Sequence, residues 1–203
     1  TLKDVYAAPF AGDGTVVMPH FRVNTFTEVQ QVAPAVAALA DGSFVVAWES
    51  SPHGPDMDGT GVFAQRFDAR GQALGQEFIV NATTEGDQSE VDLVALPDGG
   101  FAAIWTSALP GVDADEVRLR RFTAEGAPVG EELPVNAASD GWQNQPLASL
   151  TTDDRLAITW ASMSYADSLD GDRGAAALRF FDVPLAGTAT GDVWTGTEAS
   201  EGY

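Results

Sequence analysis

The sequence predicts an all-β fold of three tandem four-stranded antiparallel units in a β-propeller-like arrangement. A fourth composite blade from strands at the two ends of the chain is one way to close it. Three observations predict this fold. A unit of about 56 residues occurs three times. One strand of the unit is apolar on both faces. The 21 glycines and 11 prolines supply the turns that many short strands require.

The repeat is visible as matches at fixed offsets. A Val-Asn pair is followed by a glutamine 7 residues later, by a tryptophan 17 residues after that, and then by an Arg-Phe pair. The matching residues are Asn24, Asn81 and Asn136, Gln31, Gln88 and Gln143, Trp48, Trp105 and Trp160, and Arg66, Arg121 and Arg179. The spacing predicts one domain with repeats at about 23–79, 80–134 and 135–192, and closing strands in 1–22 and 183–203.

Each repeat reads as four strands, which in the first repeat are expected at 34–40, 44–49, 62–67 and 77–81. The side chains of the second strand point alternately to its two faces and are apolar on both, so we expect this strand to be buried between stacked sheets. Asp41-Gly42 suits the tight hairpin before it, whereas Asp153-Asp154 in the third repeat is a weaker turn signal. The last strand of the third repeat is expected at 191–195.

The composition excludes several kinds of partner and chemistry. With 30 acidic and 10 basic residues the net charge is −20, which disfavours nucleic acid and anionic lipid surfaces. No apolar stretch is long enough for membrane insertion. The absence of cysteine excludes disulfides and thiolate chemistry. No signal peptide is visible at the start, so we expect a piece of a longer protein with neighbouring domains.

The interval between the tryptophan and the arginine is the one that changes length, and it is acidic in every repeat. Variable loops commonly carry binding functions, and clustered aspartates with glycine can supply oxygen ligands to Ca²⁺. The candidate calcium ligands are Asp56, Asp58, Asp113, Asp115, Asp167, Asp170 and Asp172. A solvated acidic loop without metal is the other interpretation. In an up-and-down blade these loops share one side with the loops that follow the fourth strands.

The tryptophans divide into two groups. Trp48, Trp105 and Trp160 recur in the buried strand, so we expect them to pack between sheets. Trp142 lies in a polar loop and has no counterpart in the other repeats. It is the candidate for ligand contact.

The sequence favours a non-enzymatic role. Its two histidines, His20 and His53, do not recur, and no nucleophile, metal-protease or phosphate-loop motif is present. Two carboxylates can hydrolyse a glycosidic bond, but their abundance here makes them undiagnostic. We therefore expect a chain that is not an enzyme.

The repeat, with Val-Asn, then Pro-Ala-Val-Ala-Ala-Leu-Ala-Asp-Gly-Ser-Phe-Val-Val-Ala-Trp, then Gly-Val-Phe-Ala-Gln-Arg-Phe-Asp, resembles repeats of large bacterial RTX proteins exported by type I secretion. The resemblance covers about residues 21–182. It implies a secreted or cell-surface adhesion or ligand-binding module, with a cell-surface protein, matrix protein or glycan as partner. The Gly-Gly-x-Gly-x-Asp tracts that bind Ca²⁺ in that family do not occur in this sequence, so calcium binding is not carried over from the resemblance and is expected from the acidic loops alone. The alternatives are a lectin-like carbohydrate-binding propeller and an accessory domain of a secreted hydrolase.

Overall fold

The structure is a computed structural model, which describes residues 2–108, 111, 114–136, 141–163, 175–183 and 196–198. Every regular element in these ranges is a β-strand, which confirms the all-β class. The described part of the chain contains no helix of the length and apolarity needed to cross a membrane.

Three four-stranded antiparallel sheets form the body of the molecule, one for each repeat. The first sheet contains β3 (Gln31–Ala38), β4 (Phe44–Ser50), β5 (Gly61–Phe67) and β6 (Phe78–Ile79). The second contains β7 (Gln88–Ala95), β8 (Phe101–Ala108), β9 (Asp115–Phe122) and β10 (Pro128–Pro134). The third contains β11 (Gln143–Leu150), β12 (Arg155–Ser162), β13 (Ala175–Asp182) and β14 (Gly196–Glu198). In each sheet the strands lie in chain order.

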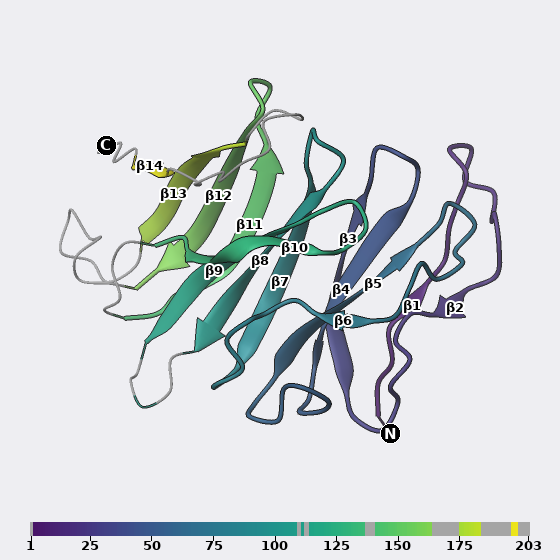
Figure 1. Ribbon diagram of the computed structural model, residues 1–203, viewed down its shortest axis with the longest axis horizontal. Helices are drawn as coiled ribbons and strands as arrows, with labels where there is room; N and C mark the ends of the chain where they lie inside the picture. The colour runs from purple at the N-terminus through teal and green to yellow at the C-terminus, as the bar shows by residue number, and fades with distance from the viewer. Residues whose placement is uncertain are drawn as a thin grey trace.

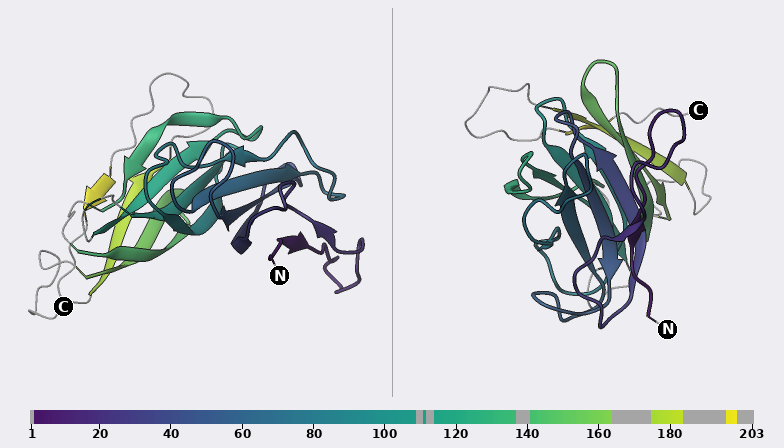
Figure 2. Two further views of the ribbon diagram at one scale, coloured as in Figure 1. Left: turned by 90° about the horizontal axis from the view of Figure 1, so that it is seen from below. Right: turned by 90° about the vertical axis from the view of Figure 1, so that its right-hand side faces the viewer.

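The sheets follow one another as a fan, with their first strands side by side (Figures 1 and 2). Strand β3 contacts β7, and β7 contacts β11. The strand order and this stacking are those of propeller blades, in which the first strand of each blade is innermost. We call β3, β7 and β11 the inner strands.

Each repeated tryptophan packs into the core that separates its own sheet from the one before it. Trp105 lies between the first and second sheets and Trp160 between the second and third. Trp48 lies between the first sheet and the N-terminal strands. This confirms the predicted packing role, because all three are at most 7% exposed.

Hydrogen bonds explain why the asparagine and the glutamine recur. The Oδ1 atoms of Asn24, Asn81 and Asn136 accept bonds from backbone nitrogens of 2.8, 2.9 and 2.8 Å, each across 19 residues of sequence. Oε1 of the glutamine accepts the indole N–H of the tryptophan in the first and third sheets, at 2.7 and 2.9 Å. The repeat signature therefore satisfies polar groups that the stacked sheets bury.

The hairpins before the second strands follow the turn signals. Gly42 and Gly99 have φ of 85° and 89°, as a glycine in a tight turn allows. In the third repeat Asp154 adopts φ 59° in place of a glycine. Aspartate tolerates this region better than most residues, so the weaker signal still formed a turn.

The composite fourth blade is a correction to the sequence-based fold. Strands β1 (Tyr6–Ala7) and β2 (Phe21–Arg22) form a separate two-stranded sheet, and β14 pairs with β13. These two ends lie on opposite sides of the fan (Figure 1). Because β14 forms its hydrogen bonds with β13, it completes the third sheet and does not join the first strands. Strand β14 begins at Gly196, and the predicted range 191–195 lies outside the described residues.

Candidate functional site

Each inner strand carries a β-bulge near its beginning, and the bulge places one residue at positive φ. The residue is Ala33 in β3, Glu90 in β7 and Gln145 in β11, with φ of 48°, 56° and 54°. The pairing register shifts beside it in all three strands. This backbone region is costly for residues with a Cβ and is concentrated at functional sites. Among the three inner strands, β7 alone has a carboxylate there.

Two glutamates join neighbouring sheets through this bulge. The backbone N–H of Glu90 donates to Oε1 of Glu49, at the end of β4, with an N···O distance of 2.6 Å. Oε2 of Glu90 in turn accepts the backbone N–H of Gln145 at 2.6 Å and the Thr106 hydroxyl at 2.8 Å. We call Glu49 and Glu90 the inter-sheet carboxylate pair.

Asp92 adds a third carboxylate to the same inner strand. Its Oδ2 accepts the backbone N–H of Ala148 in the third sheet at 2.8 Å. The equivalent positions of the other inner strands hold Ala35 and Leu147, which have no such group. Among the three inner strands, β7 of the second sheet is therefore the one that carries carboxylates at these two positions.

The environment of Glu49 favours its protonated form. Burial raises the pKa of the Glu49 carboxyl above its ordinary value. The hydrogen bond from Glu90 N–H opposes this effect, and the charges of Glu90 and Asp87 add to it. A carboxyl with a raised pKa beside a second carboxylate is the combination that acid–base chemistry on a glycosidic bond requires.

The loops that follow the second and fourth strands lie on one side, as the sequence predicts, and in the first sheet they also contact each other. Thr60 N–H donates to Oδ1 of Asp87 at 2.7 Å, and Gly86 N–H donates to Oδ2 of Asp58 at 3.5 Å. A Cβ on Gly59, which has φ 91°, would lie 2.5 Å from the carbonyl oxygen of Gly86. The close approach of the two loops therefore requires glycine at this position.

The predicted calcium ligands do not gather in the described residues. Asp56 is fully buried and Nδ2 of Asn81 donates to its Oδ2 at 2.9 Å, so it anchors the loop from within. Burial raises the pKa of the Asp56 carboxyl. Asp58 is exposed, and Asp115 is half-buried at the start of β9. The other predicted ligands lie outside the described residues, namely Asp113, Asp167, Asp170 and Asp172.

No group of three histidine or acidic side chains suited to a metal occurs in the ranges that the structure describes. Calcium binding stays a prediction, since most of the acidic loop residues fall outside those ranges.

Trp142 is 44% exposed, immediately before Gln143 at the start of β11. Its carbonyl oxygen accepts Met163 N–H at 2.8 Å, which ties the loop to the end of the third sheet's second strand. In the repeat it occupies the position of Asp87, so it belongs to the side of the fan that carries the carboxylate pair. The predicted role in ligand contact remains a prediction.

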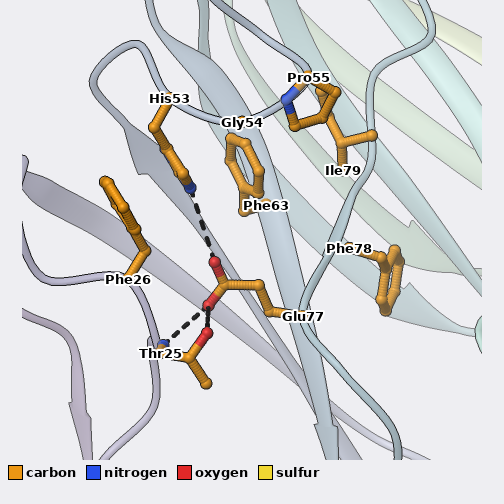
Figure 3. A pocket seen from close by; sticks show the side chains of 9 residues that line it. All are labelled: Thr25, Phe26, His53, Gly54, Pro55, Phe63, Glu77, Phe78 and Ile79. Atoms are coloured by element: carbon orange, nitrogen blue, oxygen red, sulfur yellow. Dashed lines mark hydrogen bonds and ion pairs between the residues drawn. The ribbon is translucent and has the colours of Figure 1, made fainter.

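A pocket of about 390 Å³ was not anticipated from the sequence. It lies beside the first sheet and is lined by His53, Glu77, Thr25 and three phenylalanines, among others (Figure 3). His53 has no counterpart in the other repeats. In a repeat array, a residue that departs from the pattern is the sequence signal that marks such a site.

Solved structures of glycoside hydrolases have a similar fold. A thermostable family-43 glycoside hydrolase is 10% identical, with a TM-score of 0.52, over 85% of this chain and 55% of that one. The α-L-arabinofuranosidase from Lactobacillus brevis is 10% identical, with a TM-score of 0.52, over 91% and 59%. The endo-arabinase from Bacteroides thetaiotaomicron is 13% identical, with a TM-score of 0.49, over 76% and 57%. The chain thus spans between half and three fifths of their length.

No family profile and no curated protein matches the sequence. At these identities the likeness concerns the fold, which is propeller-like.

The expectation that the chain is not an enzyme is corrected by this comparison, because the proteins that share its fold are named as glycoside hydrolases. The missing histidine and serine motifs were weak evidence, since two carboxylates suffice for glycosidic bond hydrolysis. Among 30 acidic residues the sequence offers no means of selecting two. Only the stacking of the sheets brings Glu49 and Glu90 together.

Proposed function

We propose that this chain is the saccharide-contacting part of a propeller protein that hydrolyses glycosidic bonds, with the inter-sheet carboxylate pair at its site. One observation carries the proposal. The half-buried Glu49 carboxyl, whose pKa is raised, lies against the strained bulge that presents Glu90 from the next sheet. The shared fold with glycoside hydrolases supports the same class of function.

The two carboxylates have different roles in this proposal. Glu49, protonated, donates to the oxygen of the departing sugar. Two donors, Thr106 and the Gln145 N–H, fix the orientation of the Glu90 carboxylate, which acts as the base or the nucleophile. Asp92 on the same strand accepts a hydroxyl of the bound saccharide.

Arabinose-containing saccharides are the first substrates to test, because two of the similar structures are named as an arabinofuranosidase and an endo-arabinase. The exposed ring of Trp142 offers a stacking surface for a sugar. A polysaccharide substrate also agrees with the predicted glycan partner and extracellular location, which we retain as proposals.

The test measures arabino-oligosaccharide binding by calorimetry and reducing-sugar release from arabinan. We expect Glu49→Gln to keep binding and to lower the rate of release on the order of 10²–10⁴-fold. Glutamine retains the oxygen that accepts Glu90 N–H, so the sheets stay joined. Glu125→Gln is the matched control, because it removes one carboxylate from an exposed turn.

A wild-type chain that neither binds nor cleaves these saccharides would overturn the proposal. So would a Glu49→Gln variant that cleaves as fast as Glu125→Gln. Binding without cleavage in the wild type would refute hydrolysis by this chain and leave a carbohydrate-binding propeller.

A further inference from the structure

The unanticipated pocket contains a histidine held between two aromatic rings. The His53 ring stacks on Phe26 with a centroid distance of 4.4 Å and on Phe63 with 4.2 Å, at interplanar angles of 1° and 22° (Figure 3). Its loop is closed by the backbone pair between His53 and Asp56. Both ring faces are therefore covered, and the imidazole acts through its edges.

The hydrogen bonds at one edge of the ring fix what the other edge can do. Nδ1 of His53 lies 3.2 Å from the carbonyl oxygen of Ser51 and 2.9 Å from Oγ of Ser50. A carbonyl oxygen only accepts, so both contacts are hydrogen bonds in the tautomer that carries the proton on Nδ1, and we assign that tautomer to the neutral ring. Nε2 is then an acceptor, and this buried atom has no hydrogen-bond partner in the described structure.

The group that faces this nitrogen is a second acceptor. Oε2 of Glu77 accepts both the backbone N–H and the hydroxyl of Thr25, at 2.8 and 2.7 Å. Oε1 of Glu77 points to His53 Nε2, at a distance of 3.6 Å. In this tautomer neither Nε2 nor the carboxylate oxygen has a proton to donate to the other, so a donor from outside would satisfy both atoms.

The second sheet shows what the chain itself places at this position. Glu132 corresponds to Glu77, and its Oε2 accepts the backbone N–H groups of Ala82 and Thr83 at 2.8 and 3.2 Å. Its Oε1 faces the guanidinium of Arg118, with Nε at 3.9 Å. Arg118 corresponds to Phe63, since both lie three residues before the repeated arginine. The first sheet thus keeps the carboxylate and lacks the guanidinium.

We propose that the pocket binds a guanidinium group, such as an arginine side chain of a partner protein, between Glu77 and His53. A guanidinium donates to Glu77 Oε1 and to His53 Nε2 at once. The rings of Phe26, Phe63 and Phe78 line the pocket, where they attract a flat cation. The net charge of −20 attracts basic partners to the protein as a whole. This site is separate from the carboxylate pair, so the proposal does not rest on saccharide hydrolysis.

The test uses methylguanidinium as the probe and the imidazole ¹H–¹⁵N signals as the readout. The chain has two histidines, and the exposed His20 serves as an internal control. We expect the His53 signals to begin as the Nδ1–H tautomer and to shift with a dissociation constant on the order of 1 mM, while those of His20 do not move. Methylurea, with the same shape and no charge, and sodium chloride at equal ionic strength should both leave His53 unchanged.

Two variants locate the probe. Glu77→Gln keeps an acceptor for Thr25 and should weaken binding by about tenfold or more. Phe63→Arg places an arginine where the second sheet has Arg118. Its guanidinium should fill the site and abolish the shift caused by the probe. Glu125→Gln should bind as the wild type does. Parallel shifts of both histidines, equal affinity of Glu77→Gln and Glu125→Gln, or an unperturbed His53 would each overturn the proposal.

Discussion

Replacing Asn81 with alanine tests whether the repeated asparagine holds the sheets together. Asn81 is 1% exposed and accepts the backbone N–H of Val62 at 2.9 Å. Its Nδ2 donates to Oδ2 of Asp56, to the carbonyl oxygen of Thr83 and to Oε1 of Gln88, at 2.9, 2.8 and 3.1 Å. Alanine removes all of these bonds and leaves Val62, Asp56 and Gln88 buried without them.

The expected loss follows from two of those partners. The N–H of Val62 and the carboxylate of Asp56 are both fully buried. A buried donor without a partner costs about 1–3 kcal/mol, and a lost bond to a charged group about 1.5–3 kcal/mol. We expect Asn81→Ala to lower the free energy of unfolding by about 3–5 kcal/mol.

The assay is urea denaturation followed by tryptophan fluorescence, with the slope against urea compared between variants. Asn24→Ala is the matched control, since Asn24 makes the same kind of bonds to Val5, Asp4 and Phe26. Those partners lie at the two-stranded end of the fan, where opening is local, so its effect should be smaller. A loss below about 1 kcal/mol for Asn81→Ala, or a larger loss for Asn24→Ala, would refute the reasoning.

Two further predictions concern the Glu49 carboxyl and the acidic loops, and both are measured as changes in thermal stability. Because the folded-state pKa of Glu49 is raised, its contribution to stability is fully present below the ordinary value of 4.5 and is lost as pH rises through the raised value. The melting temperature of Glu49→Gln relative to wild type should therefore increase with pH, and a pH-independent difference would contradict this. If the predicted loop sites bind Ca²⁺, the melting temperature should be higher in millimolar Ca²⁺ than in EGTA. At 100 times the dissociation constant, the free energy of unfolding should increase by about 2.7 kcal/mol. An equal response to Mg²⁺ would leave only charge screening of residues such as Asp58.

The sequence alone predicted the repeat, the four strands of the first two units, the first three strands of the third unit and the buried role of the tryptophans. These features are local or periodic, because a buried strand needs apolar residues on both faces and a tight hairpin needs a residue that tolerates positive φ. The repeated asparagine, glutamine and tryptophan recur at fixed spacing, and hydrogen bonds give a physical reason for part of this recurrence. Asn81 bonds to Gln88, Trp48 to Gln31 and Trp160 to Gln143.

The tertiary structure decided which carboxylates matter. Glu49 and Glu90 belong to different repeats, and a backbone bulge that no motif marks sets their contact. His53 and Glu77 likewise come from a loop and a later connection that meet only once the first sheet is folded. In a chain with 30 acidic residues, composition cannot distinguish a solvated carboxylate from one that burial and a neighbouring charge have changed. That distinction depends on distance and solvent exposure, which only the stacking of the sheets determines.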